Sequence, residues 1–434
     1  MIGLLTSLTA LLYSFPWLRP PEIGGVALPA QRVIAWMGLG LLIARLLVKG
    51  PLRAGPAARG FLFWVLVYFS FLLLIMVRLF AYGENFLPLY FLMDLSKYAA
   101  AFGVAYLGYY ALTAGLVSER RFVGNIIVSG ILATLVVYTL LGLYYAGFRT
   151  ETEIIAPSFG GALGVWPVGG MLPRLAGPTA EPQQLSVALL TPLLLMLSRE
   201  YIRRTWPLAV LTGSALLLSQ SKFSIVSLLL VGLYLFVVFR GWRKQIVLAG
   251  MIAAPLAGLV LVRLPTFSAT LESGLGAGAF VERLGNLVLL LTIIREHPAF
   301  GIGPGQFGAF WGQTLHGDWR SSPGYTPNMD FLKVFAETGA LGFVLLLILL
   351  GYLIRLFFRW YPHIALQTQS RYLAFALGAM GILLNMAIGY ELLHAFFWIN
   401  IAALLYFVDR ARVDSIVGSP DSAVLSAGSQ PPSR

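Results

Sequence analysis

The chain has 434 residues, of which 58% are hydrophobic and only 11% are charged, whereas soluble domains carry about a quarter charged residues. This composition excludes an ordinary soluble protein and indicates a multi-pass membrane protein. The absence of cysteine excludes disulfides and thiolate metal sites, and the net charge of +12 has to be explained by the positions of the basic residues.

Apolar segments long enough to cross a bilayer as helices recur along the sequence. We expect about twelve spans, at roughly 2–18, 30–49, 59–81, 87–113, 123–147, 184–198, 205–220, 223–240, 244–262, 332–357, 371–389 and 391–408. The two short spans that meet near Ser221 could instead form one kinked or re-entrant pair. The first segment lacks a basic start and a small-residue cleavage site, so we expect a retained span rather than a signal peptide. The expected fold is all-α, with one integral membrane domain over residues 1–413.

Short loops on one side of these spans concentrate Lys and Arg, which is typical of the cytoplasmic side. These basic residues are Arg45, Lys49, Arg53, Arg59, Arg120, Arg121, Arg199, Arg203, Arg204, Arg240, Arg243, Lys244, Arg355, Arg359, Arg371, Arg410, Arg412 and Arg434. The excess of basic residues therefore reflects the orientation of the spans in the membrane. These residues lack the aromatic, clustered context of a nucleic-acid surface. Both termini are expected inside the cell, and the segments at about 148–183 and 263–331 outside.

Two cations lie at the expected outer edges of spans. Arg174 and Glu181 occupy a turn rich in Gly and Pro, just before the span that begins near Gln184. Together they could bind a phosphate, with the carboxylate orienting it or taking a proton, or they could form an interfacial salt bridge. Lys222 follows Ser221 at the mouth between two spans, where a charge either faces water, pairs or snorkels.

The long polar segment at 263–331 interrupts the apolar sequence. Its apolar spacing predicts a helix over 280–296 that lies along the membrane interface, with Arg283 in its first turns. Residues 301–305, GIGPG, lack the strand and the Lys-Ser/Thr pair of a phosphate-binding loop, so we expect a turn packed against the bundle. His316 lies in the same segment.

Charged residues also occur at the end of the long segment and within a span. Asp330, Lys333 and Glu337 are three and four residues apart, so a helix places them on one face. Lipid exposure of this face would be costly, so we expect it to face a cavity, or to be a self-neutralised ladder without a chemical role. Asp94 and Lys97 lie one turn apart in the fourth span. We expect these charges either to have a functional role or to neutralise one another within the bundle.

The last residues, 414–434, are rich in Ser and Pro, so we expect a disordered cytoplasmic tail. No internal repeat of the kind found in many transporters is visible in the sequence. The four histidines are scattered along the chain and do not suggest a metal cluster.

Four motifs occur in a defined order along the outer segments. They are Arg-x-x-Gly-x-x-x-Glu-Pro at 174–182, Ser-Lys-x-Ser at 221–224, His-Pro-x-x-Gly-x-Gly-Pro-Gly at 297–305 and Asn-x-x-x-Leu-x-x-x-x-Glu-x-Gly-x-x-Gly at 328–342. In this order they resemble the Wzy polymerase and O-antigen ligase superfamily of membrane glycosyltransferases. The resemblance covers about residues 170 to 345, and the twelve expected spans are compatible with it.

The resemblance implies a GT-C-like fold with about twelve transmembrane helices and one long periplasmic loop that contains short helices. It implies a metal-independent inverting glycosyltransferase, without a cofactor, on the periplasmic face of the bacterial inner membrane. The donor would be an undecaprenyl-pyrophosphate-linked glycan and the acceptor a sugar hydroxyl. By this analogy Arg174, Arg283 and Lys222 would bind the pyrophosphate, and Asn328 and Lys333 would position the substrate.

The sequence departs from the family pattern before Asn328, where relatives have histidine and this chain has Pro327. The candidate bases are therefore Glu181 and Glu337, with Asp330 behind them and His316 as a substitute. The missing histidine favours a polymerase of O-antigen or exopolysaccharide repeats over an O-antigen ligase, which transfers the glycan to lipid A core in lipopolysaccharide biosynthesis. A lipid-linked oligosaccharide transporter or flippase is the alternative from another class. The expected partners are the lipid-linked donor, the glycan or lipid A core acceptor, membrane lipids and a chain-length regulator, with no nucleic acid.

Overall fold

A computed structural model describes most of the expected membrane domain. The described residues are 1–15, 30–49, 54–82, 86–146, 165–166, 174–175, 177–179, 182–219, 221–245, 277–318, 325–327, 329–386, 389 and 392–417. The expected span at 244–262 lies almost entirely outside them, as do most of the segment at 148–183 and the tail from residue 418. Helix α16 continues to Val417, so it includes the first four residues of the segment expected to be disordered.

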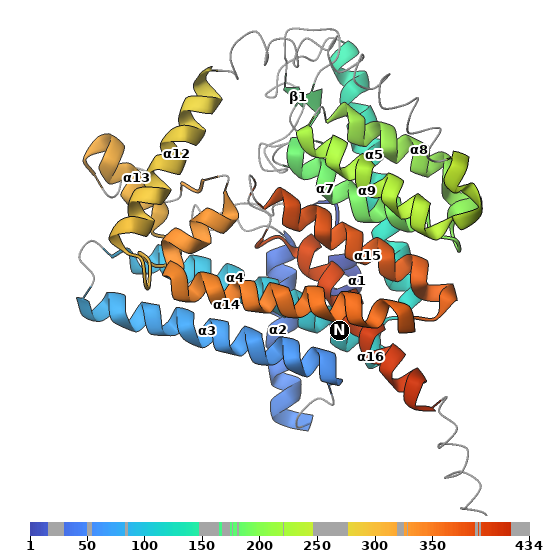
Figure 1. Ribbon diagram of the computed structural model, residues 1–434, viewed down its shortest axis with the longest axis horizontal. Coiled ribbons are helices and arrows are strands. Elements are labelled where there is room, and N and C mark those ends of the chain that lie inside the picture. The colour runs from blue at the N-terminus through green and yellow to red at the C-terminus, as the bar shows by residue number, and fades with distance from the viewer. Residues whose placement is uncertain are drawn as a thin grey trace, which may run out of the picture.

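The described chain is almost entirely helical (Figure 1), as expected from its apolar segments. The helices are α1 (Ile2–Leu11), α2 (Ala30–Lys49), α3 (Pro56–Tyr82), α4 (Pro88–Thr113), α5 (Glu119–Tyr145), α7 (Pro182–Met196), α8 (Ile202–Leu218), α9 (Lys222–Val238), α12 (Ala277–Glu296), α13 (Phe307–His316), α14 (Asp330–Trp360), α15 (Leu366–Asn385) and α16 (Ala395–Val417), with 3-10 turns at Arg240–Trp242 and Tyr361–His363. Apart from 244–262, every expected span coincides with one of these helices. The helix expected over 280–296 is α12, which begins three residues earlier.

The helices differ in their capacity to cross a bilayer. Within the described residues, three are long and apolar enough to span: Pro56–Ala81, Glu119–Tyr145 and Asp330–His363. Shorter apolar helices are Ile2–Leu11, Gln183–Met196 and Phe223–Val238. Helix α1 covers 10 residues, about 15 Å at 1.5 Å per residue, so it is shorter than the span expected at 2–18. The protein is thus a multi-pass membrane protein with helices of unequal length.

A short antiparallel hairpin is the one β feature of the described residues. Strands β1 (Val165–Trp166) and β2 (Arg174–Leu175) pair with Val165 opposite Leu175 and Trp166 opposite Arg174. Leu175 is fully buried, which anchors the hairpin to the helices. This pairing is not predictable from the sequence, because two-residue strands have no readable periodicity.

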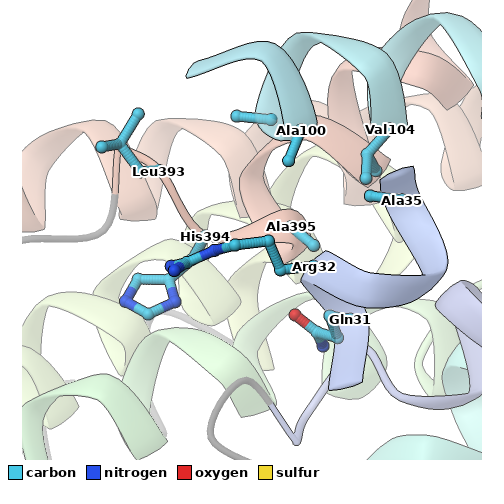
Figure 2. Close-up of a pocket in the computed structure, with 9 residues that line it drawn as sticks. Gln31, Arg32, Ala35, Ala100, Val104, Leu393, His394 and Ala395 are labelled. Atoms are coloured by element: carbon cyan, nitrogen blue, oxygen red, sulfur yellow. The ribbon is translucent and has the colours of Figure 1, made fainter. Parts of the chain in front are cut away.

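The core of the bundle lies around Trp398 on α16, which is fully buried. Its ring packs against Phe102 of α4 at 4.7 Å between centroids and against Phe61 of α3 at 6.3 Å. Farther along this face, small residues of α2, α4 and α16 leave a small pocket between the three helices (Figure 2). The core therefore joins the N-terminal and C-terminal parts of the chain.

One end of the bundle is held by ion pairs. The Arg371 guanidinium lies 2.9 Å from Glu119 and 3.0 Å from Glu200, and Arg410 lies 2.8 Å from the same Glu119. These contacts bring the starts of α5 and α15, the connection from α7 to α8 and the last turns of α16 to one end. The Arg and Lys content of these segments predicts the same common side.

Helices α12 and α13 lie at the other end of the bundle. Figure 1 shows them beside the first turns of α14 and near the end of α3 and the start of α4. They have a small apolar core of their own, which consists of Leu290, Ile293, Ile302, Phe307 and Ala336. The long segment therefore packs on α14 through buried side chains, and it contains short helices as expected.

Candidate functional site

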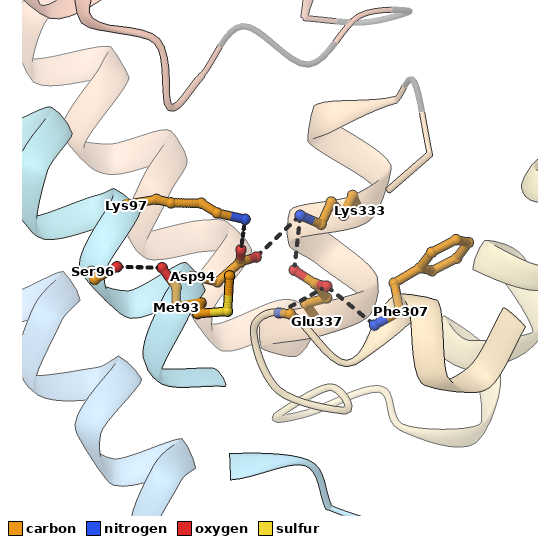
Figure 3. Close-up of polar contacts among 8 residues, drawn as sticks. Met93, Asp94, Ser96, Lys97, Phe307, Lys333 and Glu337 are labelled. Carbon is orange, nitrogen blue, oxygen red and sulfur yellow. Dashed lines mark hydrogen bonds and ion pairs between the residues drawn. The ribbon is translucent and has the colours of Figure 1, made fainter. Parts of the chain in front are cut away.

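A cluster of four charged residues joins α4 to α14 (Figure 3). Lys333 of α14 donates a hydrogen bond to Asp94 Oδ2 of α4 over 3.2 Å and lies 3.7 Å from Glu337 Oε2. Lys97 donates to the other oxygen of Asp94. We call Asp94, Lys97, Lys333 and Glu337 the charged cluster. Two ammonium groups and two carboxylates alternate in it, so their formal charges cancel.

Local helix geometry explains two of these three contacts. Asp94 and Lys97 are three residues apart and Lys333 and Glu337 are four apart, which are the spacings that bring side chains together on one helix face. Asp94, Lys333 and Glu337 are 3%, 7% and 1% exposed. At such burial a carboxylate or ammonium is retained only when it is paired, so the pairing between α4 and α14 is a condition for the packing of these helices.

Glu337 also holds the glycine-rich turn at residues 301–306. Its Oε1 atom accepts hydrogen bonds from the Gly305 amide at 3.0 Å and the Phe307 amide at 3.3 Å. Gly305 has φ of +75° and lies directly against the backbone of Tyr90 on α4, where a side chain would collide. The expectation that this turn packs against the bundle is therefore confirmed.

Helix α14 contains a backbone break at Gly339, where φ is +66° and ψ is −175°. The break allows residues 298–299 to approach: Ala340 donates its amide to the Pro298 carbonyl at 2.7 Å, and Leu341 donates to Ala299 at 3.3 Å. A glycine suits this position because its φ is positive and a Cβ atom would meet the Ala299 carbonyl. The sequence motif contains this glycine, but nothing in the apolar pattern marks the break.

Asp330, at the start of α14, binds the connection between α15 and α16. Its amide donates to the Gly389 carbonyl at 2.9 Å, and its Oδ2 atom accepts the Leu392 amide at 2.8 Å. The carboxylate is buried, at 7% exposure. Asp330 therefore fixes the backbone just before His394, while Lys333 and Glu337 on the next turns face α4 and the glycine-rich turn.

The pocket in Figure 2 lies immediately beyond this connection. Arg32 from the first turn of α2 and His394 from the residue before α16 reach toward one another across it. Gln31 lies beside them and donates its side-chain amide to the Leu12 carbonyl. The remaining lining is apolar and small: Ala35, Ala100, Ala101, Val104, Leu393 and Ala395. The sequence analysis did not select Arg32 or His394 as site residues, although each stands at the end of an apolar span.

The residues expected to carry the chemistry are only partly brought together. Lys333 and Glu337 contact one another in the charged cluster, and Asp330 lies one turn before Lys333. Arg283 is exposed on α12, and His316 is exposed at the last residue of α13. Neither forms an ion pair with the charged cluster in the described part of the chain.

The other expected site residues lie at the limits of the described chain. Arg174 belongs to β2 and Lys222 is the first residue of α9, and only their backbone is described. Glu181 and Asn328 lie outside the described residues. Arg174, Glu181, Lys222 and Asn328 therefore stay as predictions. In the part of the chain that is described, no three His, Asp or Glu side chains are grouped as metal ligands would be.

The helices, the buried charged cluster and the packed loop helices define a multi-pass membrane protein with a polar assembly at one end of its bundle. Residues 207–347 match the family model Wzy_C, described as O-antigen ligase. The chain therefore contains a domain of this family, whose members are membrane enzymes that transfer glycans, and the resemblance inferred from the motifs is confirmed for this region. A search of the curated proteins found no match.

Proposed function

We propose that the protein is a glycosyltransferase that polymerises lipid-linked glycan repeats on the outer face of the bacterial inner membrane. The match to the O-antigen ligase family over 207–347 carries this proposal. The matched region includes three of the four sequence motifs, those at 221–224, 297–305 and 328–342, and it also includes Arg283. The helix bundle supports a site for a substrate that is itself anchored in the membrane.

The orientation follows from the charges. The bundle end that holds Glu119, Glu200, Arg371 and Arg410 also carries the Arg-rich loops, so we assign it to the cytoplasm. With this assignment, both termini would lie inside the cell and α12 and α13 would lie at the periplasmic end. A lipid-linked glycan would then enter beside α12, where Arg283 is exposed.

In the proposed reaction, an acceptor sugar hydroxyl attacks the anomeric carbon of the donor from the face opposite the diphosphate. The new C–O bond forms as the bond from the anomeric carbon to the diphosphate oxygen breaks, and the lipid diphosphate leaves with the bonding electron pair. Arg174, Arg283 and Lys222 would stabilise the charge on that leaving group, which is what guanidinium and ammonium groups do for phosphates. A carboxylate would take the hydroxyl proton.

Among the candidate bases, we assign proton transfer to Glu181 and a positioning role to Glu337. Glu337 is only 1% exposed, and its oxygens are engaged by two backbone amides and Lys333. Its contacts support a role in holding the glycine-rich turn against α4. Asp330 would act similarly, by holding the connection before α16, and Asn328 and Lys333 would support the substrate side of α14. His316 is exposed, and it is the substitute base if Glu181 is not used.

The assignment of the base can be tested by two matched variants. Glu181→Gln should lower kcat by about 10²–10⁴-fold and leave both the donor KM and the unfolding temperature unchanged. Glu337→Gln should lower the unfolding temperature together with the activity, because it removes the charge that faces Lys333. A Glu181→Gln enzyme with wild-type kcat would refute the role of Glu181.

The acceptor distinguishes the polymerase from a ligase. Purified protein in detergent, given lipid-linked repeats alone, should form chains of several repeats. A ligase would need added lipid A core before any product forms, and a lipid-linked oligosaccharide flippase would form no new glycosidic bond in micelles. Product that appears only with lipid A core would overturn the polymerase assignment and retain glycan transfer.

A further inference from the structure

The pocket between α2, α4 and α16 combines cationic and apolar surfaces in one small space. Its polar side is formed by Arg32 and His394, both half-buried, and its other walls by the buried Ala35, Ala100 and Ala101. Figure 2 shows the Arg32 guanidinium directed at the His394 ring from the opposite side of the pocket. This arrangement suits a ligand with an anionic head and a hydrocarbon body.

A second cation, besides Arg32, lies next to this pocket. Lys97 is one turn before Ala100 and Ala101 on α4, and together with Arg32 it acts electrostatically on the His394 ring. Its side chain is 25% exposed, whereas its partner Asp94 is only 4% exposed. Lys97 is therefore the most accessible member of the charged cluster.

The walls of the pocket are fixed by contacts outside it. Asp330 holds the Leu392 amide at 2.8 Å, which sets the backbone that leads into Leu393 and His394. Gln31 ties the first turn of α2 to the Leu12 carbonyl. The side chains of Arg32 and His394 thus project from anchored backbone, which lowers the entropic cost of ordering them around a ligand.

We infer that this pocket binds the diphosphate head of a polyprenyl lipid, with the first isoprene units against the alanine wall. The inference rests on the proposed function, because joining two lipid-linked glycans requires a place for each of two diphosphate heads. The exposed Arg283 on α12 serves the donor, and the Arg32 pocket holds the carrier of the acceptor. Guanidinium and ammonium groups bind phosphate oxygens through charge-assisted hydrogen bonds, and apolar side chains such as those of the alanine wall suit contact with a hydrocarbon chain.

The test measures binding of fluorescent geranylgeranyl diphosphate to the purified, full-length protein in neutral detergent. Arg32→Gln should weaken binding about tenfold or more, since a charge-assisted contact is lost. Arg45→Gln, on the same helix but near its other end, where Arg45 lies over the Tyr110 ring, should change binding less than about twofold. The same comparison is made with Arg283→Ala in both proteins, so that the donor site does not take up the probe, and equal binding with and without Arg32→Gln would then overturn the inference.

A second variant covers the case in which Arg32→Gln does not fold. Ala100→Leu leaves every charge in place but fills the wall of the pocket, so it should weaken binding of geranylgeranyl diphosphate without weakening that of inorganic pyrophosphate. If a folded Ala100→Leu protein binds the prenyl diphosphate as tightly as wild type, the isoprene units do not bind against the alanine wall.

Competition distinguishes the possible sources of the phosphate. Phosphatidylglycerol or inorganic pyrophosphate should compete at least about tenfold more weakly than unlabelled geranylgeranyl diphosphate, and equal competition by either one would overturn the assignment to a prenyl diphosphate. Because binding is measured without turnover, failure of the inference about the Arg32 pocket can be distinguished from failure of the proposed function. Diphosphate binding at Arg32 without polymer formation would contradict the polymerase, and polymer formation by an Arg32→Gln protein at wild-type rate would contradict the pocket.

Discussion

Lys333 of α14 lies 3.2 Å from Asp94 of α4, and 239 residues separate them in the sequence. Both side chains are almost completely buried. The contact joins the helix that follows the long polar segment to the helix that forms one wall of the Arg32 pocket.

Loss of the Lys333 charge should destabilise the protein strongly. Lys333→Met removes the cation between Asp94 and Glu337 and leaves buried carboxylates with less compensation, at a cost of about 3–5 kcal/mol. Thermal unfolding in detergent measures the effect. Lys244→Met, an exposed lysine near α9, is the matched control and should stay within about 0.5 kcal/mol of wild type.

A double variant tests whether this cost is electrostatic. Asp94→Asn in the Lys333→Met background removes one of the carboxylates that lost its partner, so the double variant should be less destabilised than the sum of the single variants. Strictly additive effects would show that Lys333 and Asp94 do not interact.

Gly339 should be intolerant of any side chain. Gly339→Ala places a Cβ atom against the Ala299 carbonyl at a positive φ, so it should lower stability by more than about 1 kcal/mol and release residues 298–300 from α14. Gly351→Ala, in the same helix with open space around it, should raise stability by about 0.5–1 kcal/mol. Hydrogen exchange at Ala340 and Leu341 reports the release, and unchanged exchange in Gly339→Ala would contradict the account.

Arg283 should affect activity and leave folding unchanged. The side chain is exposed on α12, so Arg283→Ala should leave the unfolding temperature within experimental error while long-chain product falls at least about 100-fold, as expected for loss of a charge-stabilising group. Arg295→Ala, an exposed arginine in the last turn of the same helix, should keep full activity. Equal chain lengths from the two variants would remove Arg283 from the site.

Asp409 should act purely on stability. Its carboxylate accepts the amides of Ala57 at 2.9 Å and Ala58 at 3.2 Å and the Tyr109 hydroxyl at 3.0 Å, so it caps the start of α3. Asp409→Ala should lower stability by about 1–3 kcal/mol, whereas the exposed Asp414→Ala on the same helix should have little effect. The specific activity of the folded Asp409→Ala fraction should match wild type.

The apolar pattern was sufficient to predict where helices form, because each span carries its own hydrophobic run. It could not predict that α1 ends at Leu11 or that α14 breaks at Gly339, because these features depend on backbone contacts with distant residues. The contact of Gly339 with residues 298–299 is an example: the motif contains the glycine, and only the fold supplies its neighbour.

Two of the three contacts in the charged cluster were predictable from the sequence, and the third was not. Helical spacing alone pairs Asp94 with Lys97 and Lys333 with Glu337, but the contact between Asp94 and Lys333 depends on how α4 packs beside α14. Arg32 and His394 escaped selection because each is a single charged or titratable residue beside an apolar run, without a motif of its own. A pocket built from three helices leaves no such local signal in the sequence.

The central claim is that a new glycosidic bond forms at the expense of a lipid diphosphate bond, and stoichiometry tests it most directly. Purified protein in micelles, supplied with lipid-linked repeats as its sole substrate, should release one free lipid diphosphate for each repeat added to a chain. Longer chains together with equimolar diphosphate would meet the prediction. Unchanged repeats and no released diphosphate, from folded protein that binds the substrate, would contradict it.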